Sequence, residues 1–426
     1  MNKIIHPRPL AGAVQVPSSK SMTHRELICA ALAEGESIVD NVSLSKDIEA
    51  TIRCMEALGA SFDEAPSHFP GRDAYAVTGG IGPRAGEVLM DCGESGSTLR
   101  FLIPIGLYAG VSAVYTGHGR LGERPLTPYH TLFDACGIRW HGKGLPFSAE
   151  GVLSPGRYEL PGDVSSQFFT GLLFVLPLLS GDSVLSSTTA LESAGYIDMT
   201  LDCMARHGVE VGNPAPGRYE IPGGQTYRAG RFQVEGDYSQ AAFWLAAGLL
   251  GTGIRTEGLS PHSRQGDRAI IDILRSMGGQ IERDGDAFLA HPSLTEGTVV
   301  HAEEVPDLVP VLAALAAVSR GRTVITGAAR VRLKECDRLH AMAEELERLG
   351  ASIEEKPDGL VIDGKESLTG GTVSSWNDHR IAMALAAISS RCDAPLTVTG
   401  AECVAKSYPL FWEDFAELGG ETDEEK

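Results

Sequence analysis

The chain has 426 residues, of which 43% are hydrophobic and 22% are charged, and these proportions exclude a disordered or collagen-like chain. Asp and Glu outnumber Lys and Arg by 56 to 36. The resulting net charge of −20 argues against binding to nucleic acid or to an anionic membrane, because both need a positive field. A small anionic ligand would need a local cluster of cations instead.

Cysteine spacing and local hydropathy also bear on the class of protein. The eight cysteines are scattered without a C-x-x-C pair, and no dinucleotide-binding G-x-G-x-x-G is present, so we expect reduced thiols, no metal, no cofactor and a cytoplasmic location. The N-terminal segment has no apolar core typical of a signal peptide. The most apolar run, 168–179, is too short to span a membrane and predicts a buried helix. The acidic end, 421–426, is expected to be frayed.

An amphipathic segment recurs six times along the chain, and each copy ends at a glycine. These glycines are Gly59, Gly137, Gly208, Gly278, Gly350 and Gly419. Their separations of 78, 71, 70, 72 and 69 residues are close to one sixth of 426. A glycine directly after a helix is typical of the left-handed position that ends it. The spacing therefore predicts six similar units.

A strongly apolar segment precedes each amphipathic one, and short β-like runs separate the two kinds. The apolar segments are 26–35, 101–110, 171–181, 243–251, 311–321 and 381–391. A helix that is apolar on most faces has to be buried, whereas an amphipathic helix can face solvent on one side. Alternating strands and helices predict an α/β protein with partly parallel sheets, built as two similar domains of three units each.

The first two apolar helices begin with polar residues that suit an anion. Lys20 and Arg25 bracket the first helix start, where free backbone N–H groups also bind anions. The second begins with a Gly/Ser turn at 93–98, followed by Arg100. The alternatives are an ordinary capped helix with solvated charges and a purely structural turn.

Later helix starts are also unusual. Residues 165–167 provide three neutral hydrogen-bonding side chains, which suit sugar or ring hydroxyls, although a plain N-cap would need only one of them. Asp307 is equally consistent with a cap and with a functional carboxylate. Asn377 is the expected cap of the sixth helix. Arg380 in the first turn opposes the helix dipole, so it is better explained by an anionic ligand.

The loops before the amphipathic helices carry a second set of polar side chains. They include Arg124, Ser193, Tyr196, Lys334, Glu335, Arg338 and Lys406. One charged loop is usually only solvated, but the repeat places these loops at equivalent corners of the units. If the two domains face each other, the cations converge into a basic pocket for at least two anions. Asp307 and Glu335, with Lys20, are then the candidates for proton transfer.

Ten motifs, in order from Pro17 to Phe411, resemble those of the EPSP synthase family of enolpyruvyl transferases. They are PSSKSMTHR, GESGSTLR, GERPL, SSQFFTGLL, ESAGYID, VEGDYSQAAFWLAA, VPDLVPVLAALA, RLKECDRLHAMAEELERLGA, NDHRIAMALA and AKSYPLF. The resemblance implies six βαβαββ units around buried parallel helices, an inside-out α/β barrel, with no cofactor and no metal. It also implies transfer of the enolpyruvyl group of phosphoenolpyruvate to the 5-hydroxyl of shikimate 3-phosphate by addition and elimination.

The resemblance assigns ligands to matching positions. Shikimate 3-phosphate would contact Lys20, Ser21, Arg25, Ser165, Ser166, Gln167, Ser193, Tyr196, Asp307 and Lys334. Phosphoenolpyruvate would contact Lys20, Gly96, Arg124, Gln167, Arg338, Arg380 and Lys406. Asp307 is the expected base on the hydroxyl, and Glu335 with Lys20 is expected to move the proton at the methylene carbon.

The motif positions also divide the chain, because the first motif begins near residue 18 and the fourth buried helix near residue 237. The expected division is a discontinuous domain of residues 1–17 and 237–426, an inserted domain of residues 18–236, and a hinge near 17–20 and 234–238. The expected partners are the two small substrates alone, with no nucleic acid, no membrane and a monomeric chain.

Two alternatives stay open. The related transferases that act on UDP-N-acetylglucosamine carry a reactive cysteine where this chain has Gly119. A non-catalytic anion-binding repeat protein would explain the cations but not the coexistence of Asp307 and Glu335. The chain also departs from the family at 94–97, where Glu-Ser-Gly-Ser replaces Asn-Ala-Gly-Thr, and Arg330 stands where one branch has Asn.

Overall fold

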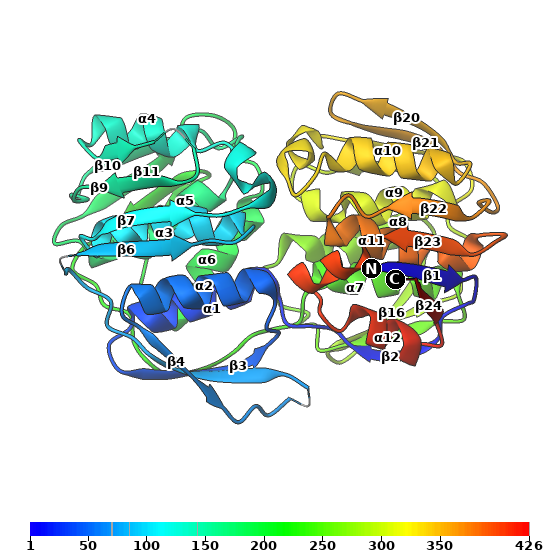
Figure 1. The fold of residues 1–426 in the computed structure, drawn as a ribbon, viewed down its shortest axis with the longest axis horizontal. Helices are drawn as coiled ribbons and strands as arrows, with labels where there is room; N and C mark the ends of the chain where they lie inside the picture. Colours follow the sequence, from blue (N-terminus) through cyan, green and yellow to red (C-terminus); the bar gives the residue numbers. More distant parts are fainter. Residues whose placement is uncertain (70, 85, 143, 426) are drawn as a thin grey trace. The chain divides into compact units, whose positions relative to one another are not determined.

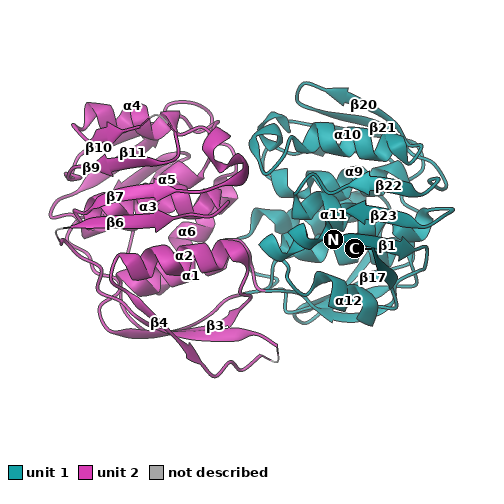
Figure 2. Cartoon of the chain, in the orientation of Figure 1, with its two compact units in different colours: residues 1–17, 235–426 teal, residues 18–234 magenta. Residues whose placement is uncertain are grey.

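A computed structural model describes residues 1–69, 71–84, 86–142 and 144–425 (Figure 1). The chain divides into two compact units (Figure 2). Unit 1 consists of residues 1–17 and 235–426, and unit 2 consists of residues 18–234. The second crossing between the units lies two residues before the boundary expected from the motifs.

Unit 2 contains three successive repeats. The first has α1 (Lys20–Leu32), β3 (Glu36–Val42), α2 (Lys46–Ala57), β4 (Ser61–Ala65) and β5 (Asp73–Thr78). The second has β6 (Glu87–Asp91), α3 (Gly96–Tyr108), β7 (Ser112–Thr116), α4 (Thr127–Ala135), β8 (Arg139–His141) and β9 (Phe147–Glu150). The third has β10 (Arg157–Leu160), α5 (Gln167–Val175), β11 (Ser183–Ser187), α6 (Ala194–Arg206), β12 (Gly212–Ala215) and β13 (Arg218–Ile221).

Unit 1 repeats the same order of elements. Its first repeat has α7 (Tyr238–Leu250), β15 (Ile254–Glu257), α8 (Ile270–Ser276), β16 (Gln280–Asp284) and β17 (Ala287–His291). The next has β18 (Val299–His301), α9 (Val309–Ala317), β19 (Arg322–Thr326), α10 (Arg338–Arg348), β20 (Ser352–Lys356) and β21 (Gly359–Asp363). The last has β22 (Gly371–Ser374), α11 (His379–Ala387), β23 (Leu396–Thr399), α12 (Phe411–Glu417) and β24 (Glu421–Glu425).

Each repeat forms a four-stranded mixed sheet. In the order β6-β7-β9-β8, the first two strands run parallel because a helix connects them, and the remaining pairs are antiparallel. The same order recurs in β10-β11-β13-β12 and β18-β19-β21-β20. The βαβαββ repeat expected from the resemblance is therefore confirmed.

The two strands next to the crossings are exchanged between repeats. Strand β2 (Gly12–Gln15) leads into α1 but pairs in parallel with β15 of unit 1. Strand β14 (Arg231–Gln233) leads into α7 but pairs in parallel with β3 of unit 2. Strand β1 (Asn2–His6) pairs with β23 and β24, so the N-terminal segment completes two sheets of unit 1.

The apolar helices lie inside the units, as predicted. All 13 residues of α7 are buried, and α11 packs against both α7 and α9. In unit 2, α3 packs against α5. The run 168–179 continues from α5 into one 3-10 turn at Leu176–Leu178, because Pro177 has no N–H to continue the α-helix. Among the described residues, no helix is both long and apolar enough to cross a membrane.

The six glycines predicted to end the amphipathic helices all adopt a left-handed backbone. Their φ angles run from 75° at Gly137 to 104° at Gly59. Glycine reaches this region without steric cost, whereas other residues are strained there. The predicted repeat boundary is therefore confirmed at every unit.

The acidic C-terminal segment corrects an expectation. Instead of fraying, residues 421–425 form β24, which pairs with β1 along its whole length. Side chains reinforce the ladder, since Lys3 binds Glu424 at 2.6 Å and His6 lies 2.9 Å from Asp423. The pairing involves basic residues at the other end of the chain, so the local sequence of the acidic segment could not predict it. Lys426 lies outside the described residues.

Candidate active site

In unit 1, Asp307 lies in a 3-10 turn, Pro306–Leu308, directly before α9. The helix α9 begins without a side-chain cap, so Asp307 is not its N-cap. Its carboxylate accepts hydrogen bonds from Arg338 Nη1 at 2.8 Å and Arg380 Nη2 at 3.1 Å, and Lys334 Nζ lies 3.5 Å away. Of the two interpretations of Asp307, the structure favours a carboxylate held among cations.

The Arg338 side chain connects three carboxylates and is only 1% exposed. Besides Asp307, it donates from Nη2 to Glu335 at 2.7 Å and from Nε to Asp378 at 2.8 Å. Asp378 is also the N-cap of α11 and accepts a hydrogen bond from the Arg380 N–H at 2.9 Å. Asn377, the expected cap, precedes the cap position and has a φ of 54°, so this expectation is wrong.

Burial and neighbouring charges act in opposite directions on the pKa values in this cluster. Burial alone would raise the pKa of Asp307, but Arg380, Lys334 and Arg338 outweigh it and hold this pKa well below its usual range. Burial lowers the pKa of Lys334. For Arg338, burial acts in the same direction, but Asp378, Glu335 and Asp307 raise its pKa well above normal.

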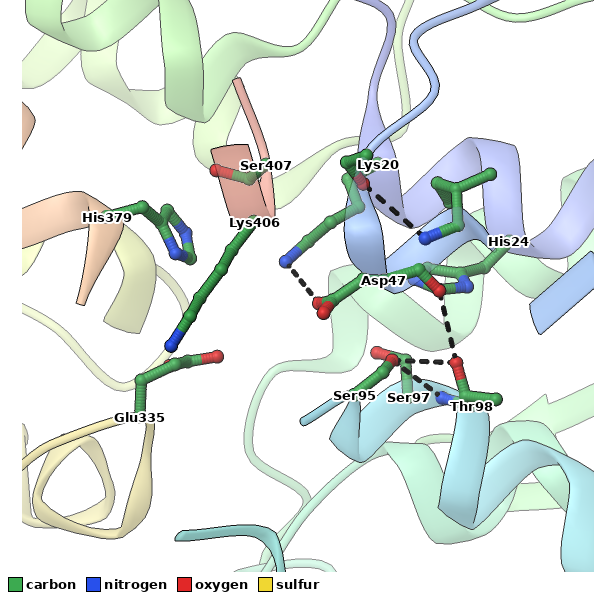
Figure 3. Close-up of polar contacts among 12 residues, drawn as sticks. Lys20, His24, Asp47, Ser95, Ser97, Thr98, Glu335, His379, Lys406 and Ser407 are labelled. Carbon is green, nitrogen blue, oxygen red and sulfur yellow. Dashed lines mark hydrogen bonds and ion pairs between the residues drawn. The ribbon is translucent and has the colours of Figure 1, made fainter. Parts of the chain in front are cut away.

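Lys406 completes the set in unit 1. It ends the 3-10 segment Ala401–Lys406, and its Nζ donates to the Asn377 carbonyl at 2.8 Å. Figure 3 shows its side chain extending toward Glu335. The structure thus brings together all the site residues predicted for this unit, with four basic side chains beside three acidic ones. They are Lys334, Arg338, Arg380 and Lys406, with Asp307, Glu335 and Asp378.

In unit 2, Lys20 is the first residue of α1, which Ser19 caps. Its Nζ binds Asp47 Oδ2 at 2.9 Å (Figure 3). Asp47 lies in the first turn of α2, and its carbonyl accepts a hydrogen bond of 3.4 Å from Thr98 near the beginning of α3. The starts of three helices therefore meet at Lys20. Sequence reasoning missed Asp47, because an acidic residue in a first helical turn is ordinary.

Arg25 joins α1 to α6. Its guanidinium donates to the Ser21 carbonyl at 2.6 Å, the Tyr196 carbonyl at 2.8 Å and Thr200 Oγ1 at 2.8 Å. Burial lowers the pKa of Arg25 to about 10, so it remains a cation at neutral pH. Ser193 precedes α6 with a left-handed φ of 56°. The structure therefore gathers Ser21, Arg25 and Tyr196, as predicted, and places Ser193 at the beginning of the same helix.

Gly96 and Arg124 are neighbours. A Cβ built on Gly96 would lie 2.5 Å from Arg124 Nη1, so the guanidinium packs against bare backbone at the start of α3. At the start of α5, Gln167 donates to Ser97 Oγ at 2.9 Å and accepts from Arg100 at 2.8 Å.

The two serines before Gln167 have different roles in the helix start. Ser165 Oγ accepts a hydrogen bond of 3.3 Å from the Gln167 N–H, although Ser165 precedes the N-cap position. Ser166 makes no side-chain cap bond. Capping therefore does not account for the polar side chains of Ser166 and Gln167.

The departures from the family motifs also have a structural place. A Cβ at Gly119 would lie 2.7 Å from Glu94 Oε2, and Gly119 has a φ of 59°. A cysteine at this position would therefore be strained and would meet the Glu94 carboxylate. Arg330 donates from Nη2 to the Glu303 carbonyl at 2.7 Å.

The cysteines show one feature that their spacing along the sequence did not predict. All eight are free, but Cys29, Cys203 and His207 cluster, with one ligand atom from each within 4.8 Å of the others. Among the described residues, these three side chains form the one group that could hold a metal ion. The spacing argument missed it because Cys29 and Cys203 are 174 residues apart and meet only through the packing of α1 on α6.

Comparisons with known proteins agree with this geometry. Residues 4–415 match the family model described as EPSP synthase (3-phosphoshikimate 1-carboxyvinyltransferase). A 3-phosphoshikimate 1-carboxyvinyltransferase of Clostridium kluyveri is 49% identical over 422 residues, which cover 99% of this chain and 98% of the relative. One of Clostridium acetobutylicum is 48% identical over 423 residues, with the same coverage of 99% and 98%.

Solved structures show the same likeness. An EPSP synthase of Acinetobacter baumannii superposes with a TM-score of 0.79 at 26% identity, covering 99% of this chain and all of that one. Its fold is therefore similar to that of this chain over both units. The family match and the identity to these relatives both extend over nearly the whole length. The chain belongs to the EPSP synthase family, the 3-phosphoshikimate 1-carboxyvinyltransferases.

Proposed function

We propose that this chain transfers the enolpyruvyl group of phosphoenolpyruvate to the 5-hydroxyl of shikimate 3-phosphate and releases phosphate, a step of aromatic amino acid biosynthesis. The observation that carries the proposal is the set of four cations around Asp307 and Glu335 in a chain of net charge −20. Both substrates are multiply charged anions, and the reaction moves two protons, so it needs cations and carboxylates together.

The cations suit phosphoenolpyruvate. The planar guanidinium groups of Arg338 and Arg380 can each form bidentate hydrogen bonds to a carboxylate or a phosphate. Arg124, packed on Gly96, and Lys20, held by Asp47, supply unit 2's contribution. Without a bound anion these cations neutralise the protein's own carboxylates, and the substrate's carboxylate and phosphate would take over part of that role.

Neutral side chains suit the ring of shikimate 3-phosphate. Ser166 and Gln167 at the start of α5 offer hydroxyl and amide groups, and Ser193 and Tyr196 come from the start of α6. Ser165 precedes the start of α5, and Ser21 and Arg25 lie on α1. In unit 1, Asp307 and Lys334 would contact the ligand.

Asp307 would take the proton of the 5-hydroxyl as its oxygen bonds to the central carbon of phosphoenolpyruvate. Glu335 with Lys20 would deliver a proton to the methylene carbon, which gives a tetrahedral intermediate. Loss of that proton and cleavage of the carbon–oxygen bond to phosphate then yield the enol ether. In the free protein the depressed pKa makes Asp307 a weak base. Anions bound to Arg380, Lys334 and Arg338 would weaken their pull and raise this pKa.

Transfer to UDP-N-acetylglucosamine is disfavoured by position 119. The cysteine of those enzymes would need a left-handed backbone and the space that Glu94 occupies. A purely anion-binding protein is the other alternative, and it predicts binding of both ligands without turnover.

The test is phosphate release from shikimate 3-phosphate plus phosphoenolpyruvate, with each substrate alone and with UDP-N-acetylglucosamine as controls. We expect release only with the first pair, and a loss of about a hundredfold or more in kcat for Asp307→Asn and Glu335→Gln. Asp272→Asn and Glu354→Gln, both at exposed ion pairs, are matched controls and should retain full activity. No release from the first pair overturns the proposal, and normal turnover of Asp307→Asn overturns the base assignment.

A monomeric chain, a cytoplasmic location and a hinge near 17–20 and 234–238 stay predictions. Light scattering after size-exclusion chromatography measures the oligomeric state. Small-angle scattering with and without both substrates tests the hinge, since closure should reduce the radius of gyration and a rigid chain should not change.

A further inference from the structure

Two helices of unit 2, α1 and α6, bring together three metal-binding side chains that the proposed reaction does not use. Cys29, Cys203 and His207 are each fully buried, with one ligand atom from each within 4.8 Å of the others. The two Sγ atoms are 3.7 Å apart. In a tetrahedral site with Zn–S bonds of about 2.3 Å, two sulfurs lie about 3.8 Å from each other. The thiols are therefore already spaced as ligands of one ion.

The imidazole of His207 is also oriented as in a metal site. Its Nδ1 lies 3.2 Å from the Arg228 carbonyl, which can only accept, so Nδ1 carries the proton. The nitrogen left to bind a metal is Nε2. Metal-binding histidines commonly donate their other N–H to a backbone carbonyl in this way. Stacking on Phe232, with ring centroids 3.7 Å apart, fixes the ring.

Glu26, which is fully buried, borders this group through His207. Its Oε2 lies 3.0 Å from His207 Nε2, and Arg206 pairs with its Oε1 at 2.5 Å. Glu26 and Cys29 are three residues apart on α1, and Cys203 and His207 are four apart at the end of α6. Each spacing puts both side chains on one face of a helix, so each helix contributes a pair.

We infer that Cys29, Cys203 and His207 form a structural site for a zinc ion, with Glu26 as the fourth ligand. His207 Nε2 and Glu26 Oε2, which lie 3.0 Å apart, share a proton in the metal-free protein. The ion displaces this proton and those of the two thiols, so three protons leave for each ion bound. Two thiolates neutralise the ion, and Arg206 neutralises Glu26, so the occupied site carries no net buried charge. Thiolate and imidazole ligands suit zinc better than magnesium or calcium.

The site would act on stability and not on the chemistry. Four protein ligands leave no open position for a substrate, which is typical of structural zinc sites. The ion would fasten α1 to α6, the two helices that Arg25 already joins near their other ends.

The test is titration of the reduced, metal-free full-length protein with Co²⁺ and then Zn²⁺. We expect one Co²⁺ per chain, with thiolate-to-cobalt charge-transfer absorption and the intense visible bands of tetrahedral cobalt, both removed by Zn²⁺. The melting temperature should rise with Zn²⁺ concentration, while turnover with zinc removed should stay within about twofold at a temperature where the protein is folded.

Variants separate the site from other thiols. Cys29→Ser, Cys203→Ser and His207→Gln should each lose the thiolate bands or weaken binding at least tenfold, and Glu26→Gln should weaken it. Cys54→Ser is the matched control, because Cys54 belongs to another pair of buried thiols in the same unit, with Cys92. Circular dichroism identifies any variant that does not fold, and the remaining variants then decide.

Three outcomes overturn the inference. They are absence of cobalt binding by the folded, reduced protein, binding that survives in Cys29→Ser and Cys203→Ser, and a Cys29–Cys203 disulfide in protein isolated without a reductant and mapped by mass spectrometry.

Discussion

The buried Asp378 carboxylate should position Arg338, and Asp378→Asn tests this without changing the shape of the side chain. Asp378 is fully buried and accepts two hydrogen bonds from Arg338, of 2.8 and 3.3 Å. The amide oxygen of Asn can still cap α11, so the cap persists. The amide NH₂ group, however, faces Arg338 donors, and a hydrogen bond to a charged group contributes about 1.5–3 kcal/mol.

Asp378→Asn should lower the free energy of unfolding by about 3 kcal/mol. This is the low end of the range of about 3–5 kcal/mol for breaking a buried ion pair, because Arg338 keeps Asp307 and Glu335 as partners. For a unit of this size that corresponds to a fall in melting temperature of about 6–12 °C. Thermal unfolding followed by circular dichroism measures it.

Kinetics separate positioning from stability. If the misalignment of Arg338 weakens the binding of phosphoenolpyruvate by about 1.4 kcal/mol, the KM for this substrate rises roughly tenfold. The KM for shikimate 3-phosphate should change less, because Arg338 is assigned to the other substrate. Initial rates of phosphate release, with each substrate varied at saturation of the other, give both constants.

The matched control is Asp337→Asn, the same substitution at the cap of α10. Asp337 accepts from the His340 N–H at 3.1 Å and pairs with Arg332 away from the cluster, in a partly exposed position. It should cost less than about 1 kcal/mol. Equal melting temperatures for the two variants, together with an unchanged KM for phosphoenolpyruvate in Asp378→Asn, would refute the reasoning.

Three further predictions follow from particular contacts. Gly96→Ala should raise the KM for phosphoenolpyruvate several-fold in rate assays while the protein still folds, because the new Cβ displaces the flexible end of Arg124; an unchanged KM contradicts this. Because the pKa of Asp307 is depressed in the folded state, its stabilising effect is fully present above the unfolded pKa of about 3.9 and is lost as pH falls from there through the lower folded pKa. Asp307→Asn should therefore melt below the wild type at pH 7 by a margin that narrows as the pH is lowered below about 3.9, and a gap that does not narrow in acid would exclude this origin. Deleting residues 421–426 should lower the melting temperature of the protein by several degrees, because it exposes the edge of β1, and no change would mean that β24 adds nothing.

Much of the fold could be predicted because the signals are local. A helix that is apolar all round, such as α7, has to be buried wherever it lies, and a glycine such as Gly137 marks a helix end through its own backbone freedom. The repeated order of such signals was enough to predict six units of alternating strands and helices, and the family resemblance implied the βαβαββ order. The motifs likewise single out Asp307, Arg338 and Arg380, which the structure brings into contact.

What the sequence left open concerns partners that are distant along the chain. Whether Asp307 caps a helix or lies among cations depends on arginines 31 and 73 residues away. The C-terminal strand depends on β1, and the Cys29–Cys203–His207 group depends on the packing of α1 against α6. Sequence periodicity specifies which face of an element is buried, because that follows from one helix or strand alone. Tertiary structure alone decides which buried side chains meet, because that follows from how separate elements pack.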